Sequence, residues 1–442
     1  MRTWKGQRKM DEKKLLYLAL GLSALIRSVI FFLIYPDTSI ITALDQRGYV
    51  DLADYIAQHW DFGLGFGSER MPLYPLFIAL CQLFSKNLFF LLVIQNVIGI
   101  FSVYFLYKIG LLISRRVSII MAFLAALNLN FAVQSNTILT ESIFYPVFTI
   151  FLLNLFQYAR TKDKFKIALA GFILGVCTLI RSVTMYLPPV IILYLIFQNR
   201  LHFIHKLRHI IYFSAVFALM VAPWMYRNYT IYGYPGLTSQ GSAHIIGWIV
   251  ADVRQNEEKI DLSLAMQKSS QLWEEKKKTF PERVRNNPFR LDKEAKKYGL
   301  EYLLSASPLS VAKAWFFGGM KNIFVPVTVE LAYILKMDWT HFYESPGASP
   351  PEQAFNFIFR NKNKVYSTML ITGLLTMLLF RMVQIYGGWK LFNQDRGIFG
   401  ISCLIIVYFL LISGPVGYAK YRLPFEPILI MLTALPFERE SR

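Results

Sequence analysis

The stretch "LLYLALGLSALIRSVIFFLIY", residues 15–35, is apolar over the length that a helix needs to cross the hydrocarbon of a membrane. Its basic flank is like that of a signal peptide, but the apolar run is too long and lacks a small-residue cleavage site, so we interpret it as a retained first span. The whole chain agrees with this interpretation. With 55% hydrophobic and 17% charged residues and a mean hydropathy of +0.40, its 442 residues are too apolar for an ordinary soluble protein.

Further apolar runs of this kind predict an all-α polytopic bundle of about ten transmembrane helices. The ten runs lie near residues 15–35, 88–113, 117–134, 141–159, 166–180, 183–198, 210–227, 365–386, 397–414 and 423–437. Two more apolar stretches would raise the number to twelve. We interpret residues 72–84 as an interfacial helix because the run is short, and we expect residues 307–328, which Lys313 and Lys321 interrupt, to lie on the outer surface.

The distribution of lysine and arginine orients the bundle, because cytoplasmic loops carry an excess of both. Basic residues gather before the first span and again at 115–116, 160–166 and 200–208. This pattern places the N-terminus in the cytoplasm and makes residues 36–87 and 229–364 exoplasmic.

Three regions are therefore expected. Residues 1–228 form an N-terminal transmembrane bundle that includes the first outer loop, residues 36–87. Residues 229–364 form a mostly helical exoplasmic cap, and residues 365–442 form the C-terminal transmembrane helices.

Composition also excludes several classes of protein. The net charge of +19 follows the cytoplasmic loops, so we do not expect a nucleic-acid partner. The chain has no P-loop, no GxGxxG after a strand, no HExxH and no GxSxG. Neither a disulfide framework nor a zinc site is indicated, because the three cysteines lie in apolar runs without ligand spacing: Cys81, Cys177 and Cys403.

The first outer loop contains "ALDQRGYVDLADYIAQH", residues 43–59, in which apolar residues from Tyr49 onward recur at i, i+3, i+4 and i+7. This spacing predicts a short amphipathic helix led by Asp45. A carboxylate at the outer face of a membrane could accept a proton from an attacking hydroxyl or amine. Aspartate is also a good helix N-cap, and the spacing alone leaves both interpretations open.

Two short segments, "RMPLYP" at 70–75 and "RLPFEP" at 422–427, share the form Arg-x-Pro-apolar-x-Pro. Proline favours the first turn of a helix, whose N-terminus attracts anions, so Arg70 and Arg422 are candidates for holding a phosphate. The alternative is that both are interfacial arginines with their charged ends in water.

Two more charged residues are expected at the outer face. Glu141 begins a predicted span, where it is either functional or a charge that the helix dipole favours. Arg181 lies at the tip of an apolar hairpin, where it is either interfacial or directed at an anionic ligand.

Several segments occur in a recognisable order over residues 15–436: "LDQRGYVDLADYI", "RMPLYPLFIAL", "LTESIFYPV", "GFILGVCTLIRSVTMYLPP", "VAPWMYRNYTIYG" and "YAKYRLPFEPILIM". The ordered set resembles the GT-C class of integral membrane glycosyltransferases, in particular bacterial relatives of protein O-mannosyltransferases and of the lipid A aminoarabinose transferase. The resemblance implies a polyprenyl- or dolichyl-phosphate-linked sugar donor and a glycan, lipid or protein acceptor.

It also implies roles for particular residues. Asp45, which Tyr49 follows, would be the catalytic base, and Arg70, Arg181 and Arg422 would contact the lipid phosphate, with Glu141 near the phosphate or an ion. The family often has a second acid directly after the first, where this chain has Gln46. No cofactor is therefore certain, although a divalent cation remains possible.

We thus expect a multi-pass glycosyltransferase of the plasma (inner) membrane with an exoplasmic active site. One base opposite the leaving group implies inversion, because a retaining route would need a second, nucleophilic carboxylate. The alternatives are a transporter or flippase of a lipid-linked or anionic solute, and a non-catalytic scaffold. The glycosyltransferase hypothesis predicts that Asp45 and at least two of Arg70, Arg181 and Arg422 converge on one outer cavity.

Overall fold

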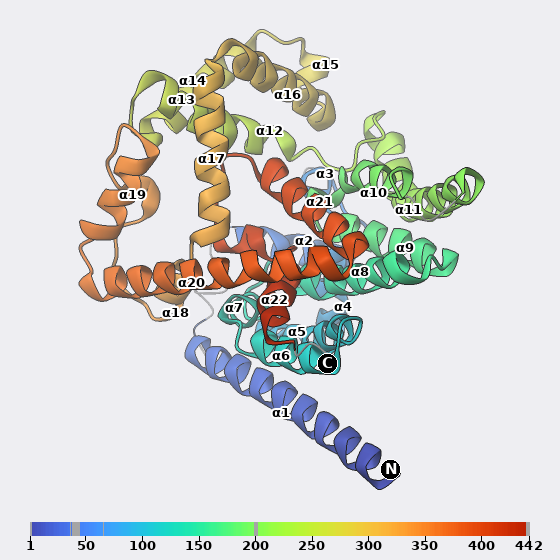
Figure 1. Ribbon diagram of the computed structural model, residues 1–442. Coiled ribbons are helices and arrows are strands. Elements are labelled where there is room, and N and C mark those ends of the chain that lie inside the picture. The colour runs from blue at the N-terminus through green and yellow to red at the C-terminus, as the bar shows by residue number, and fades with distance from the viewer. Residues whose placement is uncertain (1, 36, 38–44, 65, 199–201, 439–442) are drawn as a thin grey trace.

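The computed structural model describes residues 2–35, 37, 45–64, 66–198 and 202–438, except for the side chains of residues 2–11 and 343. Over these residues the chain is helical and contains no strand, which confirms the all-α fold class (Figure 1). The side chains of the basic residues at 2–9, and residues 43–44 of the first outer loop, lie outside this description.

The N-terminal helices occur where apolar runs predicted them. They are α1 (Arg2–Ile34), α2 (Asp45–His59), α3 (Phe66–Glu69), α4 (Leu73–Gln82), α5 (Leu88–Leu111), α6 (Arg115–Ala126), α7 (Leu129–Ser135), α8 (Glu141–Thr161), α9 (Lys164–Ile180), α10 (Leu187–Ile196) and α11 (Phe203–Tyr232).

A second set of helices stands at the top and left of Figure 1. It comprises α12 (Gly241–His244), α13 (Ala251–Glu258), α14 (Leu262–Lys278), α15 (Glu282–Arg285), α16 (Pro288–Ser305), α17 (Pro308–Phe324), α18 (Thr328–Ile334) and α19 (Pro350–Phe359). The C-terminal part comprises α20 (Lys364–Gln394), α21 (Arg396–Ser413), the 3-10 turn η5 (Ala419–Arg422) and α22 (Glu426–Ala434).

The number of membrane spans is smaller by length and composition than the sequence predicted. Six described helices are long and apolar enough to cross a membrane, namely residues 12–34 of α1, and α5, α8, α11, α20 and α21. A seventh span results if α6 and α7, which are bent by 53° at the break between them, cross together. The segments predicted at 166–180, 183–198 and 423–437 are also helical, but each helix is too short for this criterion, so the count of about ten is not confirmed.

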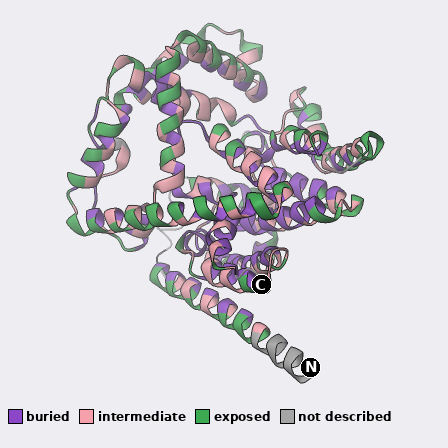
Figure 2. Cartoon of the chain, in the orientation of Figure 1, coloured by how far each residue is buried: buried purple, intermediate pink, exposed green. Residues whose placement is uncertain are grey.

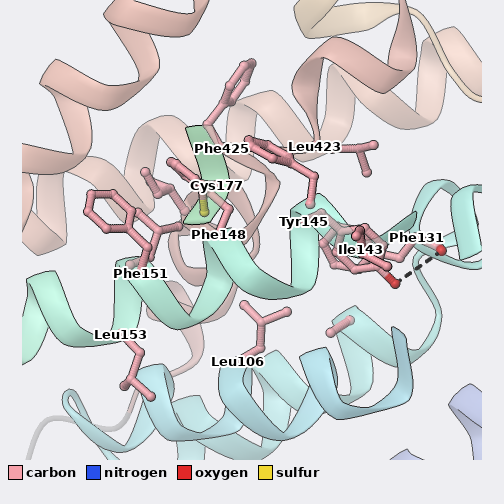
Figure 3. Close-up of a cluster of buried hydrophobic side chains, with 14 of the residues drawn as sticks. Leu106, Phe131, Ile143, Tyr145, Phe148, Phe151, Leu153, Cys177, Leu423 and Phe425 are labelled. Atoms are coloured by element: carbon pink, nitrogen blue, oxygen red, sulfur yellow. Dashed lines mark hydrogen bonds between the residues drawn. The ribbon is translucent and has the colours of Figure 1, made fainter. Parts of the chain in front are cut away.

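Helix α8 forms the centre of the bundle. Most of its residues are buried, whereas the flanking helices expose their outer faces (Figure 2). Its aromatic rings pack along the helix and across to α21, with the Phe148 ring 5.1 Å from that of Phe151 and 5.4 Å from that of Phe409 (Figure 3). A helix that is apolar all round is stable only inside other elements, so α8 joins the N-terminal and C-terminal parts into one body.

A buried arginine fixes α1 to this bundle, and the sequence analysis did not single it out. Arg27 is 1% exposed and donates to the hydroxyl of Tyr145 at 3.1 Å, to Ser135 Oγ at 3.4 Å and to the carbonyl of Gly99 at 3.3 Å. These acceptors come from α8, α7 and α5, and all are neutral. Polar groups at membrane depth need internal partners, so this arginine specifies how four helices meet.

Helix α17 connects the upper helices to the C-terminal ones. That residues 307–328 lie on the outer surface of the membrane stays a prediction. Within the protein, Gly318 packs against the backbone that follows α21. A Cβ atom at Gly318 would lie 2.3 Å from the carbonyl oxygen of Gly414, so only glycine permits this approach. The helix therefore links two regions of the molecule (Figure 1).

Candidate active site

Asp45 and Arg70 form the first part of the candidate site. Asp45 is the first residue of α2, and its Oδ1 accepts a hydrogen bond from an Arg70 terminal nitrogen at 2.9 Å. Its side chain is 63% exposed, whereas that of Arg70 is 11% exposed. Among the described residues the carboxylate bonds to this arginine and not to its own helix, so an N-cap is not its observed role.

Tyr49 holds Arg70 in place. The guanidinium lies 4.6 Å from the centre of the Tyr49 ring and donates to its hydroxyl at 3.3 Å. Burial raises the pKa of Tyr49 above its ordinary value, so the hydroxyl stays protonated and can accept this bond. The Nε of Arg70 is buried and finds no hydrogen-bond partner in the described part of the chain. An unpaired buried donor of this kind costs about 1–3 kcal/mol, which a ligand oxygen would recover.

Glu141 and Arg181 form the second part. They make a close ion pair in which the side chains are 4% and 20% exposed, respectively. Glu141 begins α8, where its other oxygen accepts a bond from Thr140 at 2.8 Å, and Arg181 directly follows α9. Both charges act on Tyr49, so the two parts are electrostatic neighbours.

Lys420, which the sequence analysis missed, belongs to the same group. It lies in η5 and interacts electrostatically with Glu141 and Arg181. Burial lowers the pKa of Lys420, but Tyr421 and Glu141 outweigh this and raise it, so the ammonium stays charged. The signal was present in "YAKYRLP", where Lys420 is a second cation two residues before Arg422.

A small cavity opens at this cluster, and its wall is mostly apolar, with three charged residues at it. Glu141, Arg181 and Lys420 contribute the charges, and the rings of Phe144 and Phe409 contribute apolar surface. Two cations beside an apolar wall fit an anion that carries a hydrocarbon chain.

Arg422 lies apart from this cavity. It is 1% exposed, and its Nε donates to Glu426 at 2.6 Å. One terminal nitrogen donates to three carbonyl oxygens at the end of α17, at 3.0–3.2 Å: those of Asn322, Ile323 and Val325. The structure thus brings Arg181 to the cavity and Arg70 to Asp45, while Arg422 caps the C-terminus of α17.

The two Arg-x-Pro segments do start short helices, α4 and α22, as their prolines suggested. The similarity ends at the arginines, because Arg70 faces Asp45 and Arg422 faces α17.

A metal site was left open by the sequence. Within the described ranges, no three His, Cys, Asp or Glu side chains lie close enough together to hold a metal ion. Both acids of the candidate site are paired with arginine.

Comparison with known proteins adds two findings. Residues 69–226 match the family described as dolichyl-phosphate-mannose-protein mannosyltransferase, and this range includes Arg70, Glu141 and Arg181. The fold is similar to that of the archaeal oligosaccharyltransferase AglB from Archaeoglobus fulgidus, solved in complex with an inhibitory peptide and a dolichol-phosphate.

The structural match has a TM-score of 0.53 at 14% identity and covers 97% of this chain and 50% of that one. The chain thus spans about half the length of this relative, and the likeness is one of fold. No curated protein matches the sequence.

The described helices are those of a multi-pass membrane protein, and both findings are similarities to membrane glycosyltransferases of the GT-C class. Over residues 69–226 the family match agrees with the resemblance found in the sequence, and the rest of the chain is similar to this class in fold.

Proposed function

We propose that the protein transfers a sugar from a polyprenyl-phosphate-linked donor to an exoplasmic acceptor, with inversion and with Asp45 as general base. The observation that carries this proposal is the cavity in which Arg181 and Lys420 stand against the rings of Phe144 and Phe409. A lipid phosphate has both properties that this wall complements, a negative charge and a hydrocarbon chain.

The donor phosphate binds at Arg181 and Lys420. As the bond between the sugar C1 and the phosphate oxygen breaks, its electron pair passes to the phosphate, and the two cations stabilise the charge that develops there. The enzyme needs no nucleotide-binding fold for this step, since the lipid-linked sugar is already activated.

The acceptor attacks C1 from the opposite side and gives its proton to Asp45. In the structure Asp45 is bound to Arg70, whose Nε still lacks a partner among the residues described. Binding of the donor beside Arg70 weakens the hydrogen bond between Arg70 and Asp45. The carboxylate of Asp45 is then free to act as the base. Inversion follows from direct attack by the acceptor, because Asp45 takes the proton and Glu141, the carboxylate at the phosphate cavity, is held by Arg181 and is not available as a nucleophile.

The excess of lysine and arginine in the predicted cytoplasmic loops supports an exoplasmic site in the plasma membrane. In this orientation residues 229–364 form a cap over the outer face and residues 1–228 and 365–442 form the membrane part. The cap and the outer side of α2 bound the space for a glycan, lipid or protein acceptor.

The test is Asp45→Asn, which nearly preserves the shape of the side chain. Purified protein is assayed with a panel of polyprenyl-phosphate sugars, and the variant is expected to lose at least about 100-fold in transfer rate. Asp51→Asn is the matched control, because Asp51 lies on the same helix with a 56% exposed side chain. Undiminished transfer by the Asp45 variant would disprove the general-base role.

The alternative function, a transporter or flippase, is favoured by the 53° break between α6 and α7, since broken helices often flank substrate sites in transporters. A flippase would move a lipid-linked sugar across vesicles and leave it intact. Cleavage of the donor in the assay would show that the protein transfers the sugar and does not merely transport the intact donor.

A further inference from the structure

A second polar group interacts with Lys420, and its central residue does not line the phosphate cavity. Its centre is Glu330 in α18, whose carboxyl interacts electrostatically with Lys420 and is hydrogen-bonded by Tyr418. Gln134 in α7 donates to its Oε1 at 3.1 Å. The other oxygen, Oε2, is buried and has no hydrogen-bond partner within the described residues.

Two hydroxyl groups near Glu330, those of Thr328 and Tyr366, are also buried and poorly hydrogen-bonded within the described residues. Thr328 lies two residues earlier in α18, and its hydroxyl is next to that of Tyr366, which in turn feels the charge of Glu330. Both hydroxyl oxygens are buried, and the only partner that either finds among the described residues is the other, at a geometry too poor for a full hydrogen bond. Trp339 stacks on Tyr366 at 4.8 Å, so the ring is held in place.

A third partner comes from α7. Asn130 lies one turn before Gln134 and donates to the carbonyl oxygen of Ala419, the neighbour of Lys420. Its own Oδ1 is buried and lacks a partner in the described part of the chain. Buried polar atoms in native proteins are nearly always paired. These atoms of α7, α18 and α20 lack good hydrogen bonds to the described residues, and they therefore mark a place where a ligand would supply the missing partners.

The hydrogen-bonding chemistry of these atoms limits the class of ligand that can bind there. The oxygens of Glu330 and Asn130 only accept hydrogen bonds, the two hydroxyl groups donate or accept, and Lys420 donates. A phosphate would be repelled by Glu330, and a hydrocarbon would leave every one of these atoms unpaired. A sugar presents several hydroxyl groups, each able to donate and accept, and satisfies the whole set.

We propose that Glu330, Thr328 and Tyr366 form the subsite that binds the hydroxyl groups of the donor sugar. Lys420 then lies between the sugar and the phosphate, since it faces both Glu330 and Glu141. This inference rests on the proposed function, because it places the donor phosphate at Arg181. A site that pairs with a sugar hydroxyl also discriminates strongly against a sugar that lacks it.

The experiment uses the purified full chain and a set of polyprenyl-phosphate hexoses, each compared with its monodeoxy derivatives. Glu330→Gln is expected to lower kcat/KM for the natural donor by about 10- to 100-fold, the usual effect of losing a charge-assisted hydrogen bond. For one deoxy donor, the one without the hydroxyl that Glu330 binds, the same substitution is expected to change kcat/KM by less than about threefold. Glu301→Gln is the control, because that carboxylate is 61% exposed in α16.

Two outcomes overturn the subsite. One is an equal loss for every deoxy donor, which indicates a purely structural role for Glu330, and the other is no loss for any donor. Binding of sugar-free polyprenyl phosphate separates the two proposals. Glu330→Gln should leave it unchanged and Arg181→Gln should weaken it, whereas failure of wild-type protein to bind this lipid would refute the proposed function itself.

Discussion

Replacing Arg422 with methionine tests whether this arginine holds the fold or the substrate. The change leaves the buried Glu426 without its 2.6 Å partner and removes the donor from three carbonyl oxygens at the end of α17. Breaking a buried pair in this way costs about 3–5 kcal/mol. Asn128 still donates to Glu426 at 3.1 Å, so we expect a value near about 3 kcal/mol.

The double variant Arg422→Met/Glu426→Met should recover much of this loss, because it removes both charges together. Lys420→Met is the comparison from the cavity. It should lower kcat/KM by about 10- to 100-fold, the effect of losing one charge-assisted bond to the phosphate, with a smaller change in the free energy of unfolding.

The assay is unfolding of each variant in the same detergent and lipid, followed by transfer measured on the folded fraction. The reasoning is refuted if Arg422→Met unfolds like the wild type while its folded fraction loses as much transfer as Lys420→Met. In that case Arg422 would contact the donor, as the sequence alone suggested.

Three further outcomes follow from the same contacts. Arg27→Met should change the free energy of unfolding by no more than about 1 kcal/mol, because its neutral acceptors keep other partners, such as Ser102 on the carbonyl of Gly99; a loss as large as that of Arg422→Met would contradict this. Tyr49→Phe should lower kcat/KM less than about tenfold. Because burial raises the pKa of Tyr49 above its ordinary value, the pH–rate profile of this variant should match that of the wild type from about pH 6 to 9, and a changed alkaline limb would count against the assignment. Gly318→Val should destabilise the protein by about 1–3 kcal/mol or more, measured by unfolding, since its side chain would overlap the Gly414 carbonyl, and wild-type stability would show that α17 can move away.

The helices could be predicted because hydrophobic periodicity is a local signal. In α2 the residues predicted to face inward, Tyr49, Leu52, Ala53 and Ile56, are those that the structure buries. The span count could not be predicted as well, because α9 and α22 are apolar but short. Their apolar surface is buried against other helices, and sequence alone does not distinguish that environment from lipid.

For the candidate site, too, the sequence indicates some of the residues but not the contacts that they make. Asp45 and Arg70 could be singled out as charges at the ends of apolar runs, yet their contact, 25 residues apart, needed the fold. Arg422 is the clearest case, because its partners in α17 are about 100 residues away and no local motif encodes them. Lys420 lies two residues before Arg422 in the same segment, and the sequence analysis assigned the phosphate contact to Arg422 alone.

The junction between α17 and η5 has a mechanical consequence. Asn322 accepts a hydrogen bond from the Tyr418 amide at 3.0 Å, and its carbonyl oxygen accepts one from Arg422 at 3.1 Å. These bonds connect the loop that carries Lys420 to the end of α17. One turn of that helix also carries Lys321, which pairs with Asp252 in α13 at 3.7 Å. A helix of 17 residues is about 25 Å long, so a tilt of about 5° moves its end by about 2 Å. A movement of α13 would thus shift the positive charge of Lys420, so α17 mechanically couples α13 to the candidate site.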